Sequence, residues 1–488
     1  MPSPVFYEIL IRNALLLDGT GAAGHPGDLA VHGGSIARIE PAGTIPPSHS
    51  HAVIEADGLA LAPGFIDAHT HDDRVVIDRP DMPFKISQGV TTVVVGNCGI
   101  SLAPLTLNGA SPPPPLNLLG PREAFEFRHF GEYADRLADV VPSVNVVSLI
   151  GHGTLRVQTM DDPLGIADRK TVLAMRDLLN GALSDGASGF STGLYYPINA
   201  PSDADEVVAL AELLPEYGGV YATHMRNEHD RVMDSLEETF TTASRAQVPV
   251  IVSHHKCAGR ANWGRTQQTL PYIEQAAAKQ PIGLDAYPYT AGSTVLDPRF
   301  VQDDIKTMVS WCEPYPEMSG RDLGEIAKEW GCSMKEAAAK LSPAGGIFFQ
   351  MDEDDVRRVL RFPLTMIGSD GLPQDSHPHP RLWGTFPRVL GHYARDVKLF
   401  SLEEAVRKMT GLTAQRFGLS DRGLLREGYA ADLVLFDPAK IGDTATFADP
   451  IKPANGIERV IVNGVLSYTR ADGVTQRAGR LLRGRVTH

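Results

Sequence analysis

Gly64-Phe65-Ile66-Asp67-Ala68-His69-Thr70-His71-Asp72-Asp73 begins with the apolar residues of a short buried strand and continues into a pair of histidines. Side chains alternate between the two faces of a strand, so we expect His69 and His71 to point the same way, about 6–7 Å apart along the chain. That spacing suits two imidazoles on one metal ion. A His-x-His pair alone is equally typical of two polar residues at a strand edge, so the rest of the chain must decide between the two interpretations.

Length and composition indicate a globular protein with more than one domain. Hydrophobic residues make up 43% and charged residues 21% of the 488 residues. A chain of this length suits one large barrel with a smaller partner domain. The formal net charge of −14 should repel phosphate backbones, so we expect no nucleic-acid partner.

The cysteines and the N-terminus predict a cytoplasmic location. Cys98, Cys257, Cys312 and Cys332 are few and irregularly spaced, which argues against a disulfide framework and for a reducing compartment. Residues 1–8 contain no basic stretch leading into an apolar core. No apolar run reaches the roughly 18 residues of a membrane span, so we expect no membrane partner.

Both ends of the chain have the pattern of short strands joined by tight turns. Residues 29–39 predict a hairpin closed at Gly33-Gly34, and residues 459–465 contain the turn pair Asn463-Gly464. Neither end holds enough apolar surface to stand alone. We therefore expect residues 1–61 and 416–488 to form one small β-sandwich domain.

Between the ends, short apolar runs alternate with amphipathic helical stretches. Candidate strands lie at 63–70, 91–98, 144–151, 187–193, 219–225, 248–255, 282–288 and 364–370. One predicted helix over 207–214 is preceded by Ser202 with Asp205 three residues on, the pattern of a helix start. Eight strands with interleaved helices predict an α/β fold of the (β/α)8 barrel type over residues 62–415, with a doubly wound sheet as the alternative.

Two connections between these strands are longer than a crossover helix needs. Residues 99–143 include Ser111-Pro112-Pro113-Pro114-Pro115, interpreted as a rigid loop, with a motif for proline-binding domains as the alternative. Residues 290–363, between strands seven and eight, have a helical pattern of their own. We expect this insertion to lie over the barrel mouth like a lid.

Several predicted strands end in residues that bind metals. Cys98 follows the second strand, His224 the fifth, His254 the sixth and Asp370 the eighth, in addition to His69 and His71 after the first. Each has a structural alternative, such as a buried thiol or a turn aspartate. The carboxyl ends of barrel strands meet at one face, however, and imidazole, thiolate and carboxylate are the ligands that zinc prefers. Together they predict a metal site.

The motifs around these residues resemble the N-acyl-D-amino-acid deacylases (D-aminoacylases) of the amidohydrolase superfamily, and the resemblance covers essentially the whole chain. They are residues 63–73, 96–99, 221–226, 253–256, 285–289, 368–373, 378–381 and 384–388. The resemblance implies zinc-dependent hydrolysis of the amide bond of N-acyl-D-amino acids, which releases a carboxylic acid and a D-amino acid. The preference for D substrates rests on the resemblance alone.

The resemblance also implies two metal positions. One would be formed by His69, His71 and Asp370, and the other by His224 and His254. Cys98 would bridge them where many superfamily members use a carboxylated lysine. We expect one tightly bound zinc beside Cys98, His224 and His254, with a second ion possible at the other position. His255 would face the opposite side of its strand.

A mechanism follows from these assignments. Zinc polarises an amide carbonyl and acidifies water, and Asp370 beside it would accept a proton and pass it to the leaving amine. Tyr196 is the candidate hydroxyl for the oxyanion, with packing at the barrel rim as its alternative.

Substrate recognition would use cationic and hydroxyl groups for the α-carboxylate. The resemblance implies that Lys256, Tyr287 and Arg381 bind this carboxylate. The alternative interpretation of Arg381 is that it forms a salt bridge on the surface. Arg299 could pair with an acidic substrate side chain, or simply face solvent.

Two other functions remain open. A cyclic-amide hydrolase of the hydantoinase or dihydroorotase kind would use the same barrel, but such enzymes typically bridge their metals with a carboxylated lysine rather than a cysteine. A non-catalytic barrel that serves as a scaffold would be expected to have lost metal ligands, whereas this chain retains all of them.

Overall fold

The centre of the molecule is an eight-stranded parallel sheet that closes on itself. The computed structural model describes residues 6–109 and 111–483, so part of the N-terminal stretch used to predict location lies outside the described residues. In spatial order the strands are β6 (Phe65–Asp67), β7 (Val90–Val95), β10 (Asn145–Gly151), β11 (Gly189–Gly193), β12 (Val220–His224), β13 (Val250–Val252), β14 (Ile282–Ala286) and β18 (Thr365–Ile367). The Ala68 N–H donates to the Ile367 carbonyl at 3.1 Å and joins the first strand to the last. The predicted (β/α)8 barrel is confirmed.

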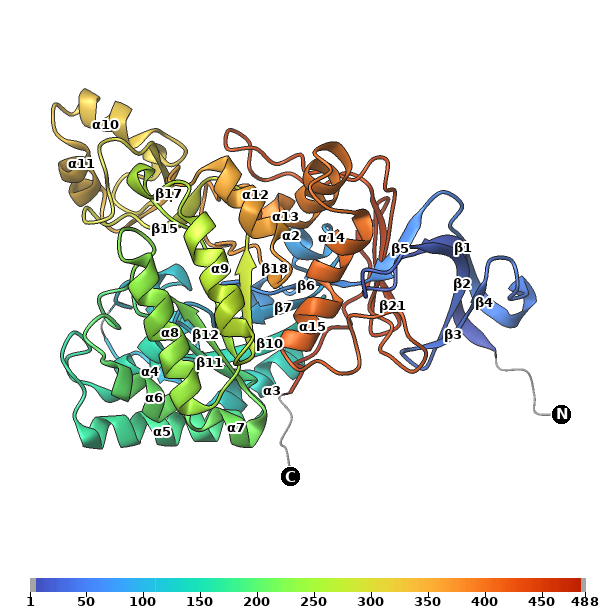
Figure 1. Cartoon of the computed structure of the whole chain (residues 1–488), viewed down its shortest axis with the longest axis horizontal. Coiled ribbons are helices and arrows are strands. Elements are labelled where there is room, and N and C mark those ends of the chain that lie inside the picture. The colour runs from blue at the N-terminus through green and yellow to red at the C-terminus, as the bar shows by residue number, and fades with distance from the viewer. Residues whose placement is uncertain (1–5, 110, 484–488) are drawn as a thin grey trace.

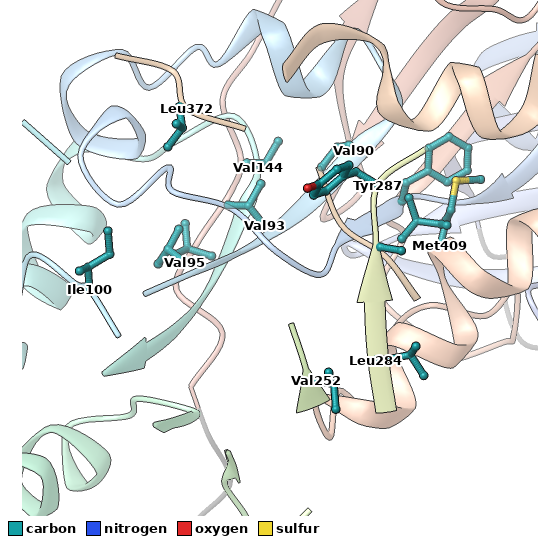
Figure 2. Packing of buried hydrophobic residues seen from close by; sticks show 14 of the residues in the cluster. Val90, Val93, Val95, Ile100, Val144, Val252, Leu284, Tyr287, Leu372 and Met409 are labelled. Atoms are coloured by element: carbon teal, nitrogen blue, oxygen red, sulfur yellow. The ribbon is translucent and has the colours of Figure 1, made fainter. Parts of the chain in front are cut away.

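Apolar runs form these strands because both faces of each strand are covered. Every residue of β7 and of β10 is buried, as expected for a parallel sheet under helices. Figure 2 shows part of this packing, with Val93 and Val95 of β7, Val252 of β13 and Leu284 of β14 in one continuous hydrophobic cluster.

Helices form the outer layer of the barrel. They are α1 (Val75–Asp78), α2 (Pro83–Ile86), α3 (Phe130–Val140), α4 (His152–Thr159), α5 (Arg169–Ser184), α6 (Ala204–Ala211), α7 (Leu214–Tyr217), α8 (Val232–Ala246), α9 (Thr266–Ala277), α12 (Glu353–Arg361), α13 (Arg381–Arg388), α14 (Leu402–Met409) and α15 (Gly411–Arg416). The predicted start of α6 is wrong by one residue. Asp203, not Ser202, accepts the N–H of Glu206, because the Ser202 hydroxyl donates to the Asn199 carbonyl of the preceding turn.

A second sheet is built from both ends of the chain. Its strands are β1 (Tyr7–Leu16), β2 (His25–His32), β3 (Ser35–Pro41), β4 (Ser50–Glu55), β5 (Ala60–Pro63), β19 (Leu433–Phe436), β20 (Ile457–Val462), β21 (Val465–Thr469) and β22 (Gly473–Val474). Strands β5 and β19 pair antiparallel, which joins the N-terminal half to the C-terminal half. The hairpins predicted at Gly33-Gly34 and Asn463-Gly464 are present as β2–β3 and β20–β21.

The connection between β14 and β18 forms a small subdomain. It contains a three-stranded sheet of β15 (Gly292–Val295), β17 (Ala344–Phe348) and β16 (Thr307–Cys312), with α10 (Leu323–Glu329) and α11 (Met334–Leu341). Figure 1 shows it at the side of the barrel opposite β1–β4. The exact limits of this insertion and of the two domains stay predictions. In residues 6–109 and 111–483, no helix combines the length and apolar character that a bilayer crossing needs.

Candidate metal centre

Three of the predicted ligands lie where the backbone turns sharply just beyond a barrel strand. Cys98, His254 and Asp370 have positive φ angles of 54°, 35° and 50°. This left-handed conformation is unfavourable for residues other than glycine, and it persists where the surrounding structure enforces it, often at functional sites. The strained turns follow β7, β13 and β18, so the three side chains reach one face of the barrel.

Cys98 lies at the middle of this cluster. Its Sγ is 3.2 Å from His69 Nε2 and 3.3 Å from His254 Nε2. Donor atoms of Cys98, His224 and His254 lie within 4.8 Å of one another, and we call these three residues the first ligand set. Those of His69, His71 and Cys98 also lie within 4.8 Å of one another and form the second ligand set.

Asp370 adjoins the second ligand set. Its Oδ1 is 3.2 Å from His71 Nε2 and 3.5 Å from His69 Nε2. Its Oδ2 is 3.0 Å from Nη1 of Arg381, a side chain that is fully buried. The six residues predicted as ligands therefore share one buried cluster, from five different strands.

The electrostatics of the cluster favour anionic Cys98 and Asp370. Burial alone raises the pKa of the Cys98 thiol, but His69, His254 and His224 outweigh it and hold this pKa well below its usual range. Burial likewise opposes ionisation of Asp370, yet Arg381, His69 and His71 keep its pKa well below its usual range. Burial lowers the pKa of His71, but Asp370 and Cys98 raise it to about 9. Without a metal, the two anions are thus balanced by protonated imidazoles, whose charge a bound cation would replace.

Unpartnered nitrogens provide the test of whether a metal fits. His71 Nδ1 and both ring nitrogens of His224 are buried and have no hydrogen-bond partner among the residues that the structure describes. Buried polar atoms are ordinarily paired, so an orphaned imidazole needs an explanation. A thiolate with several imidazoles is a donor set that zinc prefers, and the residues present fit that ion.

Two carboxylates behind the histidines were not predicted as site residues. Asp285 lies 3.4 Å from His69 Nδ1 and accepts the His254 backbone N–H at 3.0 Å. Glu228 lies 3.1 Å from His254 Nδ1 and 3.5 Å from His224 Nε2. Asp285 belongs to a motif that carried the resemblance. Glu228 has only one sequence signal, its position four residues after His224.

A buried charge network beneath the second ligand set was also missed. Lys85 of α2 is fully buried, and its Nζ is 2.8 Å from Asp67, 3.3 Å from Asp72 and 2.7 Å from the Ser369 hydroxyl. Asp67 also accepts the Ser369 N–H at 2.7 Å. These contacts tie the segment after β6 to the segment after β18, which carries Asp370.

A pocket opens onto the cluster. Its metal-binding side is formed by His71, His224, His254 and Asp370. Thr294, Phe300 and Phe348 of the inserted subdomain form another part of its wall.

The predicted substrate-binding residues differ in position. Tyr196, Lys256 and Tyr287 line the pocket. Arg381 is fully buried, lies 4.4 Å from the centre of the Tyr287 ring and is not among the described residues that line the pocket. Its ion pair with Asp370 is therefore not the surface salt bridge that was its alternative. Arg299 is not among the described residues that line the pocket. Its guanidinium is mostly exposed and binds Asp297.

His152 and His255 lie outside the cluster. His255 Nε2 lies 2.8 Å from the Thr269 hydroxyl of α9, in agreement with the predicted opposite orientation. His152, after β10, pairs with Glu206 of α6 at 2.7 Å.

Comparison with known proteins places this site in a family. Residues 52–294 and 333–468 match the Amidohydrolase family. The chain is 51% identical to the D-aminoacylase of Alcaligenes xylosoxydans xylosoxydans over 476 residues, 98% of this chain and 97% of that protein. It is 47% identical to the N-acyl-D-aspartate deacylase of the same organism over 481 residues, 98% of this chain and 96% of that protein.

Solved structures agree. One match is the N-acyl-D-glutamate deacylase of Bordetella bronchiseptica, which was solved in complex with zinc and a phosphonate mimic of the tetrahedral intermediate. It has a TM-score of 0.93 and 42% identity, and the match covers 98% of this chain and 100% of that chain. The L-hydantoinase of Arthrobacter aurescens has a TM-score of 0.62 and 16% identity over 98% of this chain and 100% of that chain, and shares the fold alone. This protein belongs to the amidohydrolase family, among the N-acyl-D-amino-acid deacylases.

Proposed function

We propose that this protein hydrolyses the amide bond of N-acyl-D-amino acids, with zinc as its metal, and releases a carboxylic acid and a free D-amino acid. The observation that carries the proposal is Asp370, which contacts His71 through one oxygen and Arg381 through the other. One carboxylate thus lies between metal-binding side chains and a cation suited to a substrate carboxylate. The relatives named D-aminoacylase and N-acyl-D-aspartate deacylase support the substrate class.

The first ligand set would hold the one zinc that the reaction needs. Both nitrogens of His224 lack a hydrogen-bond partner in the described chain, so an ion bound at this set would give a buried imidazole the partner that it lacks. The second ligand set, with Asp370, would hold a further ion more weakly. When bound, zinc polarises an amide carbonyl and makes water a stronger acid.

Asp370 would act as general base and then as general acid. Burial opposes its ionisation, but Arg381 and the two histidines keep its pKa well below its usual range, so it begins as the carboxylate that can accept a proton. It takes a proton from the attacking water and delivers it to the nitrogen of the leaving amine.

Arg381, Tyr287 and Lys256 would bind the α-carboxylate of the substrate. Nη1 of Arg381 is paired with Asp370, but Nε makes no hydrogen bond within the described residues, so the guanidinium retains a donor for a carboxylate. The guanidinium lies over the Tyr287 ring, 4.4 Å from the ring centre. Lys256 Nζ already donates to Glu228 and to the His254 carbonyl. Its third N–H group lies beside His254 Nδ1 at 2.8 Å and is left for the substrate when Nδ1 itself carries a proton.

Tyr196 would donate to the oxyanion that forms from the substrate carbonyl. Its hydroxyl lies 3.0 Å from the hydroxyl of Thr294 in the inserted subdomain. Burial raises the pKa of Tyr196 well above its usual range, so the phenol keeps the proton that such a donor needs.

We further propose a preference for uncharged substrate side chains. Tyr195, Phe300 and Phe348 form an aromatic wall of the pocket, and the Tyr195 and Phe300 rings stack at 4.6 Å. Lys256 is the one lysine or arginine among the described residues that line the pocket, and it is paired with Glu228. Arg299 is occupied by Asp297 and exposed.

A substrate screen tests these proposals. N-acetyl, N-formyl and N-succinyl amino acids would be assayed in both enantiomers, with methionine, leucine and glutamate as side chains. We expect turnover of the D forms, with N-acetyl-D-methionine and N-acetyl-D-leucine preferred over N-acetyl-D-glutamate. Hydrolysis of cyclic amides but not of these linear amides would instead favour the hydantoinase-like function.

Metal content separates an enzyme from a scaffold. We expect at least one zinc per chain after expression with adequate metal. A content below about 0.5 zinc per chain would favour the non-catalytic scaffold.

We also propose a cytoplasmic location. All four cysteines are free, and three of them are buried, as expected in a reducing compartment. Cell fractionation with a tagged protein would test this.

A further inference from the structure

Glu228 joins two metal-binding histidines to a lysine. It lies beyond the end of β12, is almost completely buried and lines the pocket beside the first ligand set. Its Oε1 is 3.1 Å from His254 Nδ1 and 2.8 Å from Lys256 Nζ, and its Oε2 is 3.5 Å from His224 Nε2.

The two histidines face Glu228 through different ring nitrogens. His254 presents Nε2 to Cys98 Sγ at 3.3 Å, which leaves Nδ1 for Glu228. Neither ring nitrogen of His224 makes a hydrogen bond within the described residues, but Nε2 lies 3.5 Å from Glu228 Oε2, which leaves Nδ1 as the nitrogen turned away from this carboxylate and available to a metal. A neutral imidazole that ligates through one nitrogen carries its proton on the other. With both residues ligating in this way, they would be opposite tautomers, and a single carboxylate would face the protonated nitrogen of both.

Lys256 holds this carboxylate in place. Its Nζ also lies 2.8 Å from His254 Nδ1. When His254 ligates through Nε2, Nδ1 keeps its proton. Lys256 Nζ and His254 Nδ1 then both donate to the same oxygen of Glu228, Oε1. Glu228 Oε1 thus has a cationic partner 2.8 Å away, beside the imidazole that it faces.

We propose that Glu228 is a positioning residue that sets the tautomers of His224 and His254 and so determines the metal affinity of the first ligand set. The inference rests on the proposed assignment of that set to zinc. Carboxylates behind ligating histidines orient the ring and make it a better donor, and their loss typically weakens metal binding about 10- to 100-fold. Here one carboxylate serves two ligands of the same ion, so its removal affects both.

Glu228→Gln tests the inference, with Glu206→Gln as the matched control. A glutamine oxygen accepts hydrogen bonds, but its NH2 group is itself a donor and cannot pair with an imidazole N–H. Glu206 is also a buried carboxylate paired with a histidine at a barrel strand end, His152, and with Arg156, but it lies outside both ligand sets. Both substitutions remove a buried carboxylate–imidazole pair, and only the first one adjoins the metal set.

Zinc affinity of the chelator-treated full-length protein would be measured by competition with a chromophoric chelator. The absorption spectrum of the cobalt-loaded protein would report the ligand geometry. We expect Glu228→Gln to bind its first zinc about 10- to 100-fold more weakly and to alter the cobalt spectrum. Glu206→Gln should match the wild type in both measurements, even where its melting temperature is lowered.

The inference would be overturned if Glu228→Gln kept the zinc affinity and the cobalt spectrum of the wild type. It would also be overturned if Glu206→Gln lost as much zinc affinity as Glu228→Gln, or if the wild type bound no zinc. Failure of the proposed function is distinguishable, because affinity does not depend on turnover. A wild type that binds zinc tightly but hydrolyses no N-acyl-D-amino acid would refute the function and leave the role of Glu228 standing.

Discussion

The Arg381 guanidinium lies 3.0 Å from the Asp370 carboxylate, within a fully buried setting at the edge of the metal cluster. The other Asp370 oxygen faces His71 at 3.2 Å. A group proposed to move protons and a group proposed to bind the substrate carboxylate are therefore in direct contact. Substrate binding at Arg381 would place the scissile amide next to Asp370, which links recognition to catalysis through one ion pair.

Replacing Asp370 by alanine should abolish deacylation while the fold and the first zinc remain. The variant lacks the proposed general base, a loss typically worth about 10²- to 10⁴-fold in rate. Kinetics with N-acetyl-D-methionine, zinc content and circular dichroism would be measured together. Hydrolysis near the wild-type rate would mean that another group accepts the proton.

Replacing Arg381 by methionine should raise KM strongly for substrates with an α-carboxylate. A hydrogen bond to a charged group contributes about 1.5–3 kcal/mol, or roughly 10- to 150-fold. Because Arg381 also contacts Asp370, the control is N-acetyl-D-methionine amide, which lacks the carboxylate. We expect kcat/KM to fall much more for the acid than for the amide. Equal losses for the two substrates would mean that Arg381 acts only through its contact with Asp370 and does not bind the substrate carboxylate.

Replacing Cys98 by alanine should remove the metal. Cys98 is the one residue common to both ligand sets, so we expect zinc to fall below about 0.5 per chain. Cys257→Ala is the matched control, because Cys257 is also buried and burial raises the pKa of its thiol to about 12. Retention of full zinc by Cys98→Ala would contradict the shared position.

Replacing Lys85 by methionine should destabilise the fold by about 3–5 kcal/mol, because it leaves Asp67 and Asp72 buried without their cation. Urea unfolding would measure this free energy. Lys408→Met is the control. Lys408 is equally buried, but its Nζ donates to the Phe362 carbonyl, and its nearest carboxylate, Glu404, is partly exposed. Similar losses in both variants would show that the buried carboxylates are not the cause.

Asp375 should make the protein less stable as the pH rises. Burial raises the pKa of Asp375 from 3.8 to about 7, and its Oδ2 has no hydrogen-bond partner in the described chain. The folded state thus holds this proton more tightly than the unfolded state. Its contribution is fully present below pH 3.8 and is lost as the pH rises through about 7.

Asp375→Asn removes this dependence. Relative to the wild type, the variant should gain up to about 4 kcal/mol between pH 4 and pH 8, as measured by urea unfolding across that range. A difference between the two proteins that does not change with pH would show that folding does not raise the pKa of Asp375.

The barrel and the residues that cluster in it were predictable because they depend on local pattern. Apolar runs set the eight strands, and parallel strands in a barrel deliver their carboxyl ends to one face. His69, Cys98, His224 and Asp370 follow directly after such runs, so the position of each could be predicted without knowing its neighbours.

The supporting residues were not predictable in this way. Lys85 lies in the short helix α2, where a lysine ordinarily faces solvent, and only the fold places it between Asp67 and Asp72. Glu228 is a loop residue whose partners, His254 and Lys256, are 26 and 28 positions away. The true helix cap at Asp203 depended on the Ser202 hydroxyl being used by the preceding turn.

Sequence alone was therefore sufficient for the barrel, for the sheet joined from both chain ends and for the kinds of atoms in the metal cluster, because strand periodicity and residue chemistry are local properties. Only the folded chain decided which partner each of these atoms has. The contact of Arg381 with Asp370, the pairing of Arg299 with Asp297 and the shared carboxylate of Glu228 all join residues through side-chain packing and burial, which no spacing along the chain specifies.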